Sequence, residues 1–370
     1  MKLESGQITS SQYMLSVACF IQSAALLSSF FTPITRQDSW LVVIFGMVAA
    51  IPVLLVYSGI MSSFPGKNLI QICNEAFGRV GGAIISLMFI WFFLTLTSLH
   101  TRDLGMLVRQ TVLVETPTVY TTSLYIILCA YALLKGIKVV MRYAFAFVII
   151  SFLLTIVSIL LTLNIMDARN FLPMLTLPAI KYVQGTNTVL SIPFGDLIAF
   201  LMVAPNVSQG KKRKRFYLFS GFLLGSATIF AVVARDTAVL GSVGALFSSP
   251  SFETLRLANL SNMLNRMEIL FIVVLVIMLF FKIAVLYYVT VLATAQLFGL
   301  KSYHPLVLML GALVIAYSVF VYPDETVHAA SGREIVPIFW LLFEFFLPLL
   351  LLIVGRARGL HKTPPSKEAA

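Results

Sequence analysis

Apolar residues along this chain come in long runs, and most polar residues gather between the runs. About 20 apolar residues are the length that an α-helix needs to cross the hydrocarbon core of a bilayer. The runs do not show the alternation of apolar and polar positions that indicates membrane strands. The pattern therefore predicts an all-α membrane protein with ten transmembrane helices, at residues 12–33, 39–61, 81–101, 119–134, 140–164, 187–207, 216–240, 268–296, 304–321 and 335–355.

The ten runs form one transmembrane domain, residues 12–355. A short cytoplasmic segment, 1–11, precedes it, and a cytoplasmic tail, 356–370, follows it. The polar stretch 165–186 separates two five-helix halves, 12–164 and 187–355. The first residues lack the basic, apolar and small-residue order of a signal peptide, so we expect no cleavage.

Composition agrees with a membrane protein. Hydrophobic residues make up 59% of the chain and charged residues 11%, so a soluble fold could not hide the apolar surface. The net charge of +11 would suggest a nucleic-acid partner in a soluble protein, but here it indicates topology. With the N-terminus inside, most Lys and Arg fall on the cytoplasmic side, including the run 211–215, which is also placed to contact anionic lipid headgroups. Both termini are therefore expected in the cytoplasm, with no nucleic-acid partner.

The sixth run contains a helix-breaking group before its middle, at Pro193, Gly195 and Asp196. Proline lacks a backbone N–H, and glycine permits unusual torsions, so a broken helix is expected here with its backbone groups facing a cavity. Asp196 would lie at the break. The alternative is a simple proline kink, with Asp196 protonated or reaching toward the interface.

The first run carries Gln22 and Ser23 at the corresponding depth. In an inverted repeat, the first and sixth helices would both be broken and would form a central site. Small polar residues also mediate ordinary helix packing in membranes. No glycine marks a break in the first run, which weakens the case for an open backbone there.

Lys282 lies at the centre of the eighth run, where an unpaired cation would cost at least about 2.5 kcal/mol on insertion. Asp196 is the first candidate for its partner, and Glu344 in the tenth run competes with it. The three groups would form a structural charge network, a proton relay or a site for a zwitterionic solute. In folds with paired broken helices, a cation on the eighth helix can lie close to the first helix, where a coupling sodium ion would otherwise bind. Lys282 therefore favours proton coupling, or no coupling, over sodium coupling.

The third run offers Thr95 and Ser98, which share a helical face and could line a pathway, although hydroxyl packing explains them as well. Arg235–Asp236 and Asp324–Glu325 are expected as solvated charge at the outer interface. Residues 251–267 have helical apolar spacing and predict an amphipathic helix over the outer face.

No phosphate-binding loop, dinucleotide glycine pattern or metal-ligand spacing occurs, so we expect no enzyme, no cofactor and no metal. The four histidines fall near interfaces or tails, at His100, His304, His328 and His361. The three cysteines show no paired spacing and are interpreted as structural, at Cys19, Cys73 and Cys129.

Several short motifs in a fixed order carry a family resemblance. They are Ile8-Thr9-Ser10-Ser11-Gln12, Gln37-Asp38-Ser39-Trp40, Phe64-Pro65-Gly66-Lys67-Asn68-Leu69, Pro193-Phe194-Gly195-Asp196, Asn265-Arg266-Met267-Glu268, and Phe343-Glu344 with Pro348. With these motifs the chain resembles the B subunits of nutrient germinant receptors of bacterial endospores, a branch of the amino acid, polyamine and organocation transporter superfamily.

The resemblance implies a five-plus-five inverted repeat of the leucine-transporter type in the spore inner membrane, with broken first and sixth helices. It implies that an amino acid or related nutrient binds in a transporter-like pocket, and that A and C receptor subunits are partners. The pocket maps onto Gln22, Ser23, the hydroxyls of the third run, and Phe194, Gly195 and Asp196. Two other functions use the same scaffold: an autonomous proton-coupled solute transporter and an ion-conducting pore.

Overall fold

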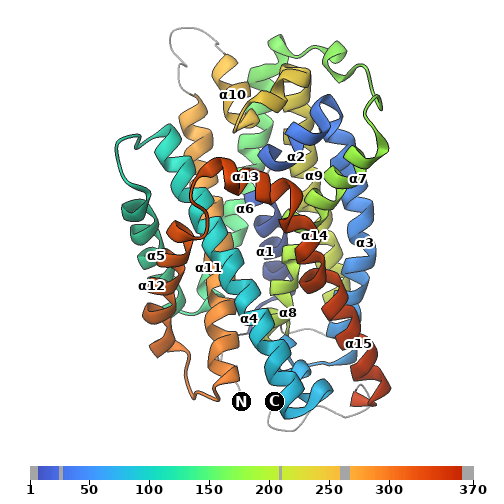
Figure 1. The fold of residues 1–370 in the computed structure, drawn as a ribbon, viewed down its shortest axis with the longest axis vertical. Helices are drawn as coiled ribbons and strands as arrows, with labels where there is room; N and C mark the ends of the chain where they lie inside the picture. The colour runs from blue at the N-terminus through green and yellow to red at the C-terminus, as the bar shows by residue number, and fades with distance from the viewer. Residues whose placement is uncertain (1–6, 25–27, 208–210, 259–266, 361–370) are drawn as a thin grey trace.

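The computed structural model describes residues 7–24, 28–207, 211–258 and 267–360, and these are nearly all helical. Ile8 and Val207 form an isolated backbone bridge beside helix ends. The long helices run between two ends of the molecule (Figure 1), with α15 ending at the lower end and α2 and α10 lying at the upper end. We call the upper end the outer end as a convention that follows the predicted topology, in which the basic run 211–215 at the start of α9 is cytoplasmic.

Each predicted span falls on helical segments. Those of the first half are α1 (Ser10–Gln22), α2 (Ser28–Thr35), α3 (Ser39–Ser63), α4 (Leu69–Thr111), α5 (Thr118–Leu134) and α6 (Ile137–Thr162). Those of the second half are α7 (Ala179–Val189), α8 (Phe200–Val203), α9 (Lys211–Leu240), α10 (Pro250–Leu257), α11 (Met267–Leu297), α12 (His304–Phe320), α13 (Glu325–Glu334), α14 (Val336–Leu341) and α15 (Leu347–Ala357).

Length and apolar composition qualify seven described segments as membrane spans, or eight if the bent pair α12 and α13 counts as one. Two of the ten predicted spans fall outside this count. Helix α1 has 13 residues before its interruption, and α5 has 17. The chain is thus a multi-pass membrane protein, and for these two helices the crossing stays a prediction.

Two of the sequence motifs are helix N-caps. The Thr9 side chain accepts a hydrogen bond from the Gln12 backbone, and the Gln12 side chain accepts one from the Thr9 backbone. Asn68 and Gln71 form the same reciprocal arrangement at the start of α4. Each capping box satisfies two backbone N–H groups that a helix end leaves unpaired. The motifs thus set the points at which α1 and α4 begin.

Helix α1 ends within the first predicted span, although that span has no glycine. Helix α1 ends at Gln22 and α2 begins at Ser28, with residues 25–27 outside the described ranges. The Ser23 hydroxyl donates to the carbonyl oxygen of Phe20 at 2.7 Å. A serine side chain can therefore satisfy a carbonyl at the end of the helix, where the sequence offers no glycine.

The sixth span changes its hydrogen-bond register rather than unwinding into an extended segment. After α7, residues Leu190–Phe194 form a π-helical turn (η5), and Gly195–Ala199 form a 3-10 turn (η6) that leads into α8. A π turn followed by a 3-10 turn redirects the carbonyl groups between them. The break lies at Pro193 and Gly195, where the sequence predicts it.

The bundle core lies between the interrupted spans and their neighbours. Helix α1 packs on α9 and α6, and α11 packs on α4, while the sixth span is almost wholly buried. Large apolar side chains of α5 and α6 remain exposed, among them Leu124, Ile127, Phe145 and Leu153. Such outward apolar surface suits contact with lipid.

Aromatic rings join α4 to the last span. Phe343 stacks on Phe92 with ring centroids 4.9 Å apart, and Trp91 also contacts Phe343 at 5.8 Å. Trp340 meets Phe92 edge to face at 5.8 Å. Phe343 belongs to a second π-helical turn, η9 (Leu342–Phe346), so this cluster surrounds a point where the last span also changes register.

The expectation that Arg235 and Asp236 are solvated is wrong. Arg235 is 3% exposed and Asp236 6%. The Arg235 guanidinium donates to Asp236 Oδ1 at 2.6 and 2.9 Å and to the Ser158 hydroxyl of α6, and the Ser251 hydroxyl of α10 donates to Asp236. Adjacent charges can be buried here because each finds its partners within the bundle.

Two surface elements at the outer end differ from expectation. The amphipathic helix expected at 251–267 is found as α10, whereas residues 259–266 lie outside the described ranges. Helix α13, which the sequence reading did not predict, is bent by 96° from α12. Asp324 is exposed as expected, and it caps α13 by accepting from the Val327 backbone at 2.8 Å.

Candidate functional site

Two opposite charges meet at the break of the sixth span. Lys282 of α11 lies with Nζ 2.7 Å from Asp196 Oδ2, and both side chains are fully buried. The ammonium also lies 3.5 Å from the Ile192 carbonyl oxygen, which belongs to η5, and 4.8 Å from the centre of the Phe20 ring. A desolvated cation is stabilised by such a carboxylate, carbonyl and aromatic face together.

The predicted competitor Glu344 does not pair with Lys282. No described cation lies within ion-pairing distance of the Glu344 carboxyl, which is 1% exposed, and neither of its oxygens has a hydrogen-bond partner in the described chain. The carboxyl instead faces the backbone at Gly195. A Cβ at position 195 would lie only 2.2 Å from Glu344 Cδ, so glycine is what permits this close approach.

A tyrosine joins the 3-10 turn η6 of the sixth span to the π-helical turn η9 of the last span. The Tyr57 hydroxyl of α3 lies 2.6 Å from the Glu344 carbonyl oxygen and 3.0 Å from the Gly195 carbonyl oxygen, and its single proton is shared between them. These are carbonyls that the altered register releases from normal helical bonding. Tyr57 therefore connects the break in the sixth span to the one in the tenth.

We expect Tyr57→Phe to lower the free energy of unfolding by about 1–3 kcal/mol, because two buried carbonyls lose their donor while the ring packing is kept. Thermal unfolding of the purified protein in detergent measures the change. Tyr131→Phe is a matched control, since Tyr131 is exposed and its loss of a hydroxyl should leave the unfolding temperature unchanged. Equal stability of the two variants would contradict the connecting role of Tyr57.

A row of ionisable groups leads from the ion pair toward the outer end. His100 Nε2 lies 3.3 Å from Asp196 Oδ2, and His100 Nδ1 lies 3.5 Å from Asp103 Oδ2. His328 Nε2 of α13 follows, 3.6 Å from Asp103 Oδ1. We call Lys282, Asp196, His100, Asp103 and His328 the charge row. It alternates basic and acidic groups at contacts close enough for electrostatic coupling.

The placement of His100 corrects the sequence reading, which put all four histidines near interfaces or tails. His100 is 3% exposed and His328 7%, whereas His304 is exposed and His361 lies outside the described residues. Helix α4 is kinked at Gly78, and the part after the kink continues to Thr111, well past the predicted end of the span at residue 101, so His100 lies inside the bundle rather than at an interface. The three cysteines are free and buried.

The other predicted site residues lie around this centre rather than in it. Gln22 Nε2 donates to the Thr228 hydroxyl of α9 at 2.9 Å, and the Thr95 hydroxyl lies 3.3 Å from that of Tyr317 on α12. Ser98 donates to the Leu94 carbonyl of its own helix at 2.9 Å. Phe194 is fully buried and meets Phe222 edge to face at 4.9 Å.

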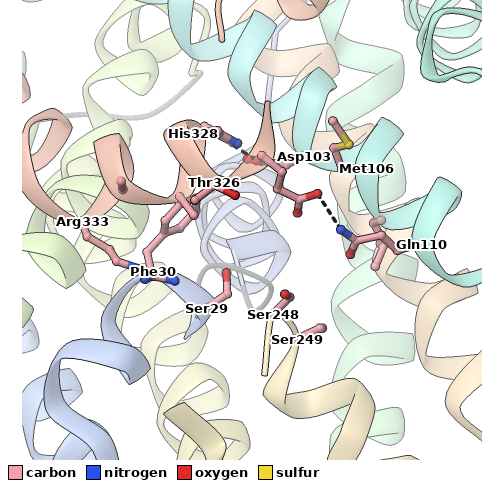
Figure 2. A pocket seen from close by; sticks show the side chains of 14 residues that line it. Ser29, Phe30, Asp103, Met106, Gln110, Ser248, Ser249, Thr326, His328 and Arg333 are labelled. Carbon is pink, nitrogen blue, oxygen red and sulfur yellow. Dashed lines mark hydrogen bonds and ion pairs between the residues drawn. The ribbon is translucent and has the colours of Figure 1, made fainter. Parts of the chain in front are cut away.

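Two cavities flank the centre. A small one, about 20 Å³, is lined by Gln22 and Arg235 among others and is large enough for a single water molecule. A larger one, about 460 Å³, lies between α2, α4 and α13. Figure 2 shows His328 and Asp103 on one side of this outer cavity and Ser248 and Ser249 on the opposite side. The charge row therefore begins at a cavity and ends in the packed interior.

The sequence did not predict that His100 and Tyr57 belong to the buried centre, or that a cavity lies at the outer end. A histidine three residues before an aspartate, His100 and Asp103, could have indicated one buried helical face. Tyr57 gives no comparable signal, because a tyrosine in an apolar run is as often simply packed. The cavity is partly lined by α13, and the polar sequence of α13 cannot be distinguished from that of a loop.

Comparison with known proteins identifies the family. Residues 7–326 match the family described as spore germination protein. Among curated proteins, the chain is 25% identical to spore germination protein KB of Bacillus subtilis (strain 168), over 95% of each chain. It is 23% identical to spore germination protein YndE of the same organism, over 95% of this chain and 97% of the relative.

A solved transporter shows the same fold. The nucleobase-cation-symport-1 family transporter Mhp1, in a closed conformation with bromovinylhydantoin bound, superposes with a TM-score of 0.61 at 14% identity, covering 96% of this chain and 84% of Mhp1. The expected leucine-transporter type of fold, a five-plus-five inverted repeat with broken first and sixth helices, is thereby confirmed. Neither this transporter nor the germination family is a class of enzyme. The chain belongs to the spore germination protein family.

Proposed function

We propose that this protein is the nutrient-sensing subunit of a spore germinant receptor. It binds an amino acid or a similar small molecule at the midplane, and its change of conformation signals to A and C subunits to trigger germination. The observation that carries the proposal is the ion pair of Lys282 and Asp196 at the break of the sixth span, in a protein of the germination family. Buried ionisable groups inside a membrane protein commonly mark a solute or ion site.

The two charges of the ion pair could each bind the opposite charge of a zwitterionic ligand. A ligand carboxylate would take the place of Asp196 at Lys282, and a ligand ammonium would bind the carboxylates that Asp196 and Glu344 present. Glu344 has no hydrogen-bond partner among the described residues, so a donor from the ligand would satisfy it. Further members of the proposed pocket are Gln22, Ser23, Thr95, Ser98, Phe194 and Gly195.

Ligand binding requires a second conformation. Asp196 and Lys282 are both fully buried, so a ligand reaches them only when the broken spans move apart. A ligand shifts such an equilibrium by its difference in affinity for the two states. That shift is the proposed signal to the partner subunits in the spore inner membrane, with both termini of this chain in the cytoplasm.

The second candidate function is an autonomous proton-coupled transporter of an amino acid or organic solute. The charge row favours it, because alternating histidines and carboxylates next to a lysine can exchange protons between an outer cavity and the midplane. The fold serves both functions equally.

Reconstitution of the purified protein into liposomes separates the two functions. Labelled amino acids are tested singly for binding and for accumulation under an imposed proton gradient, with Lys282→Met as the control that removes the midplane cation. Binding without accumulation, absent from the Lys282→Met variant, is the result expected of a sensor. Accumulation driven by the gradient would reject the sensor and establish the transporter. If no amino acid binds, the proposed ligand class is wrong.

A further inference from the structure

The outer cavity has the size of a small-molecule site. Its volume of about 460 Å³ falls within the range of roughly 300–1,000 Å³ typical of ligand pockets. It is lined from α2, α4 and α13 and from Ser248 and Ser249 before α10, so its walls come from both halves of the chain (Figure 2). The midplane ion pair is not part of its lining.

The cavity wall carries both signs of charge at separate places. Arg333 lies near one end of α13, and Glu325 lies at the other end, eight positions earlier. Asp103 of α4 adds a second carboxylate beside His328. Glu325 binds the Gln110 amide at 2.7 Å across the opening. The cation and the acidic groups are therefore held apart by the length of α13.

Arg333 forms no close ion pair in the described part of the chain, and its neighbour on α13, Glu334, acts on it only at longer range. Its Nε is buried and has no hydrogen-bond partner, and no described carboxylate lies within 4 Å of its guanidinium. The Gln184 amide donates to the Arg333 backbone carbonyl at 3.2 Å, not to its guanidinium. A partly buried guanidinium without an anion is costly, and its planar fork of donors matches a carboxylate.

The acidic side of the cavity is connected to the protein centre. Asp103 lines the cavity and contacts His100, which in turn contacts Asp196. A cation placed at Asp103 therefore acts on the midplane ion pair through two contacts of 3.5 Å or less. Charge in the cavity and charge at the midplane are coupled through His100.

We propose that the outer cavity is a second binding site, distinct from the midplane site, for a zwitterionic solute of the amino-acid class. The solute carboxylate binds Arg333, and its cationic group binds the acidic side formed by Asp103 and Glu325. The choice of amino acids rests on the proposed function, whereas the preference for separated charges follows from the cavity wall. Occupancy of this site changes the field at the midplane pair through the charge row.

Charge-selective labelling tests the site directly. In an Ala330→Cys variant, the new thiol lines the cavity one helical turn before Arg333, and the three native cysteines are buried. We expect a negatively charged methanethiosulfonate to react faster than a positively charged one. Arg333→Gln should lower this ratio of rates roughly tenfold, the effect of removing one unit charge close to the thiol. The control Arg256→Gln removes an exposed arginine of α10, paired with Glu253, and should leave the ratio unchanged.

Protection of the same thiol from labelling tests whether the ligand is an amino acid. Each proteinogenic amino acid at millimolar concentration is added during labelling of Ala330→Cys. At least one is expected to slow labelling, and the protection should disappear with Arg333→Gln but persist in the double variant Asp196→Asn with Lys282→Met, which removes both midplane charges and leaves neither unpaired. An unchanged ratio of rates with Arg333→Gln, or no protection by any amino acid, would overturn the second site. Protection that is lost in the folded double variant would assign the effect to the midplane site and overturn the second site.

Discussion

Lys282→Met is expected to abolish the nutrient response and to lower the free energy of unfolding by about 3–5 kcal/mol. The variant leaves Asp196 in a fully buried position without its cation, and removing one member of a buried ion pair carries a cost of this size. Unfolding temperature in detergent measures stability. The optical-density loss of spores that carry the variant measures the response.

The double variant Asp196→Asn with Lys282→Met separates stability from function. With both charges removed, most of the lost stability should return, but the nutrient response should not. Lys67→Met is the surface control, since Lys67 and Glu75 form a solvent-exposed pair at 2.5 Å whose loss costs less than about 1 kcal/mol. A double variant that still responds to nutrient would show that the ion pair serves structure alone.

Gly195→Ala is expected to lower the free energy of unfolding by about 1–3 kcal/mol, because the added methyl group enters the space held by the Glu344 carboxyl. Its Cβ would lie 2.2 Å from Glu344 Oε2, so either the Glu344 side chain must move or the two spans must separate at this contact. Thermal unfolding of the purified variant measures the effect.

The second change that tests this contact is Glu344→Ala. Alone it should cost less stability than Gly195→Ala, because the loss of a buried carboxyl that lacks hydrogen bonds in the described chain offsets part of the cost of the cavity that it leaves. Combined with Gly195→Ala it should restore stability, since the clashing group is gone. Gly81→Ala at a half-buried position of α4 is the control, where the nearest atom is Phe77 Cβ at 3.2 Å, on the same helix. Failure of Glu344→Ala to rescue Gly195→Ala would show that the clash lies elsewhere.

The sequence was sufficient for features that depend on local composition. Apolar runs predict spans because the bilayer demands them, and a lysine in such a run demands a partner. Asp196 lies at the predicted break, and the structure brings Lys282 to it rather than to Glu344. Proline and glycine likewise predict a break in the sixth span, because each alters backbone hydrogen bonding on its own.

Features that depend on contacts between distant parts of the chain could not be predicted from the sequence. Arg235 and Asp236 look solvated in sequence, and only the partners on α6 and α10 explain their burial. His100 was assigned to an interface from its distance along the chain, although α4 continues well past it. The sequence leaves Thr95 open between lining a pathway and ordinary packing, and it does not indicate that the Thr95 hydroxyl lies near Tyr317 of α12. In each case the missing information is which neighbouring helix faces the residue.

The aromatic cluster around Phe343 gives the protein an intrinsic optical probe. The chain has three tryptophans, and two of them, Trp91 and Trp340, belong to this cluster. The third, Trp40, packs on Phe171 and Phe230. Phe343 directly precedes Glu344, which faces the sixth span. Movement of the tenth span away from the sixth therefore changes the surroundings of two of the three tryptophans. Fluorescence of the unlabelled protein can therefore follow the opening of the bundle in real time.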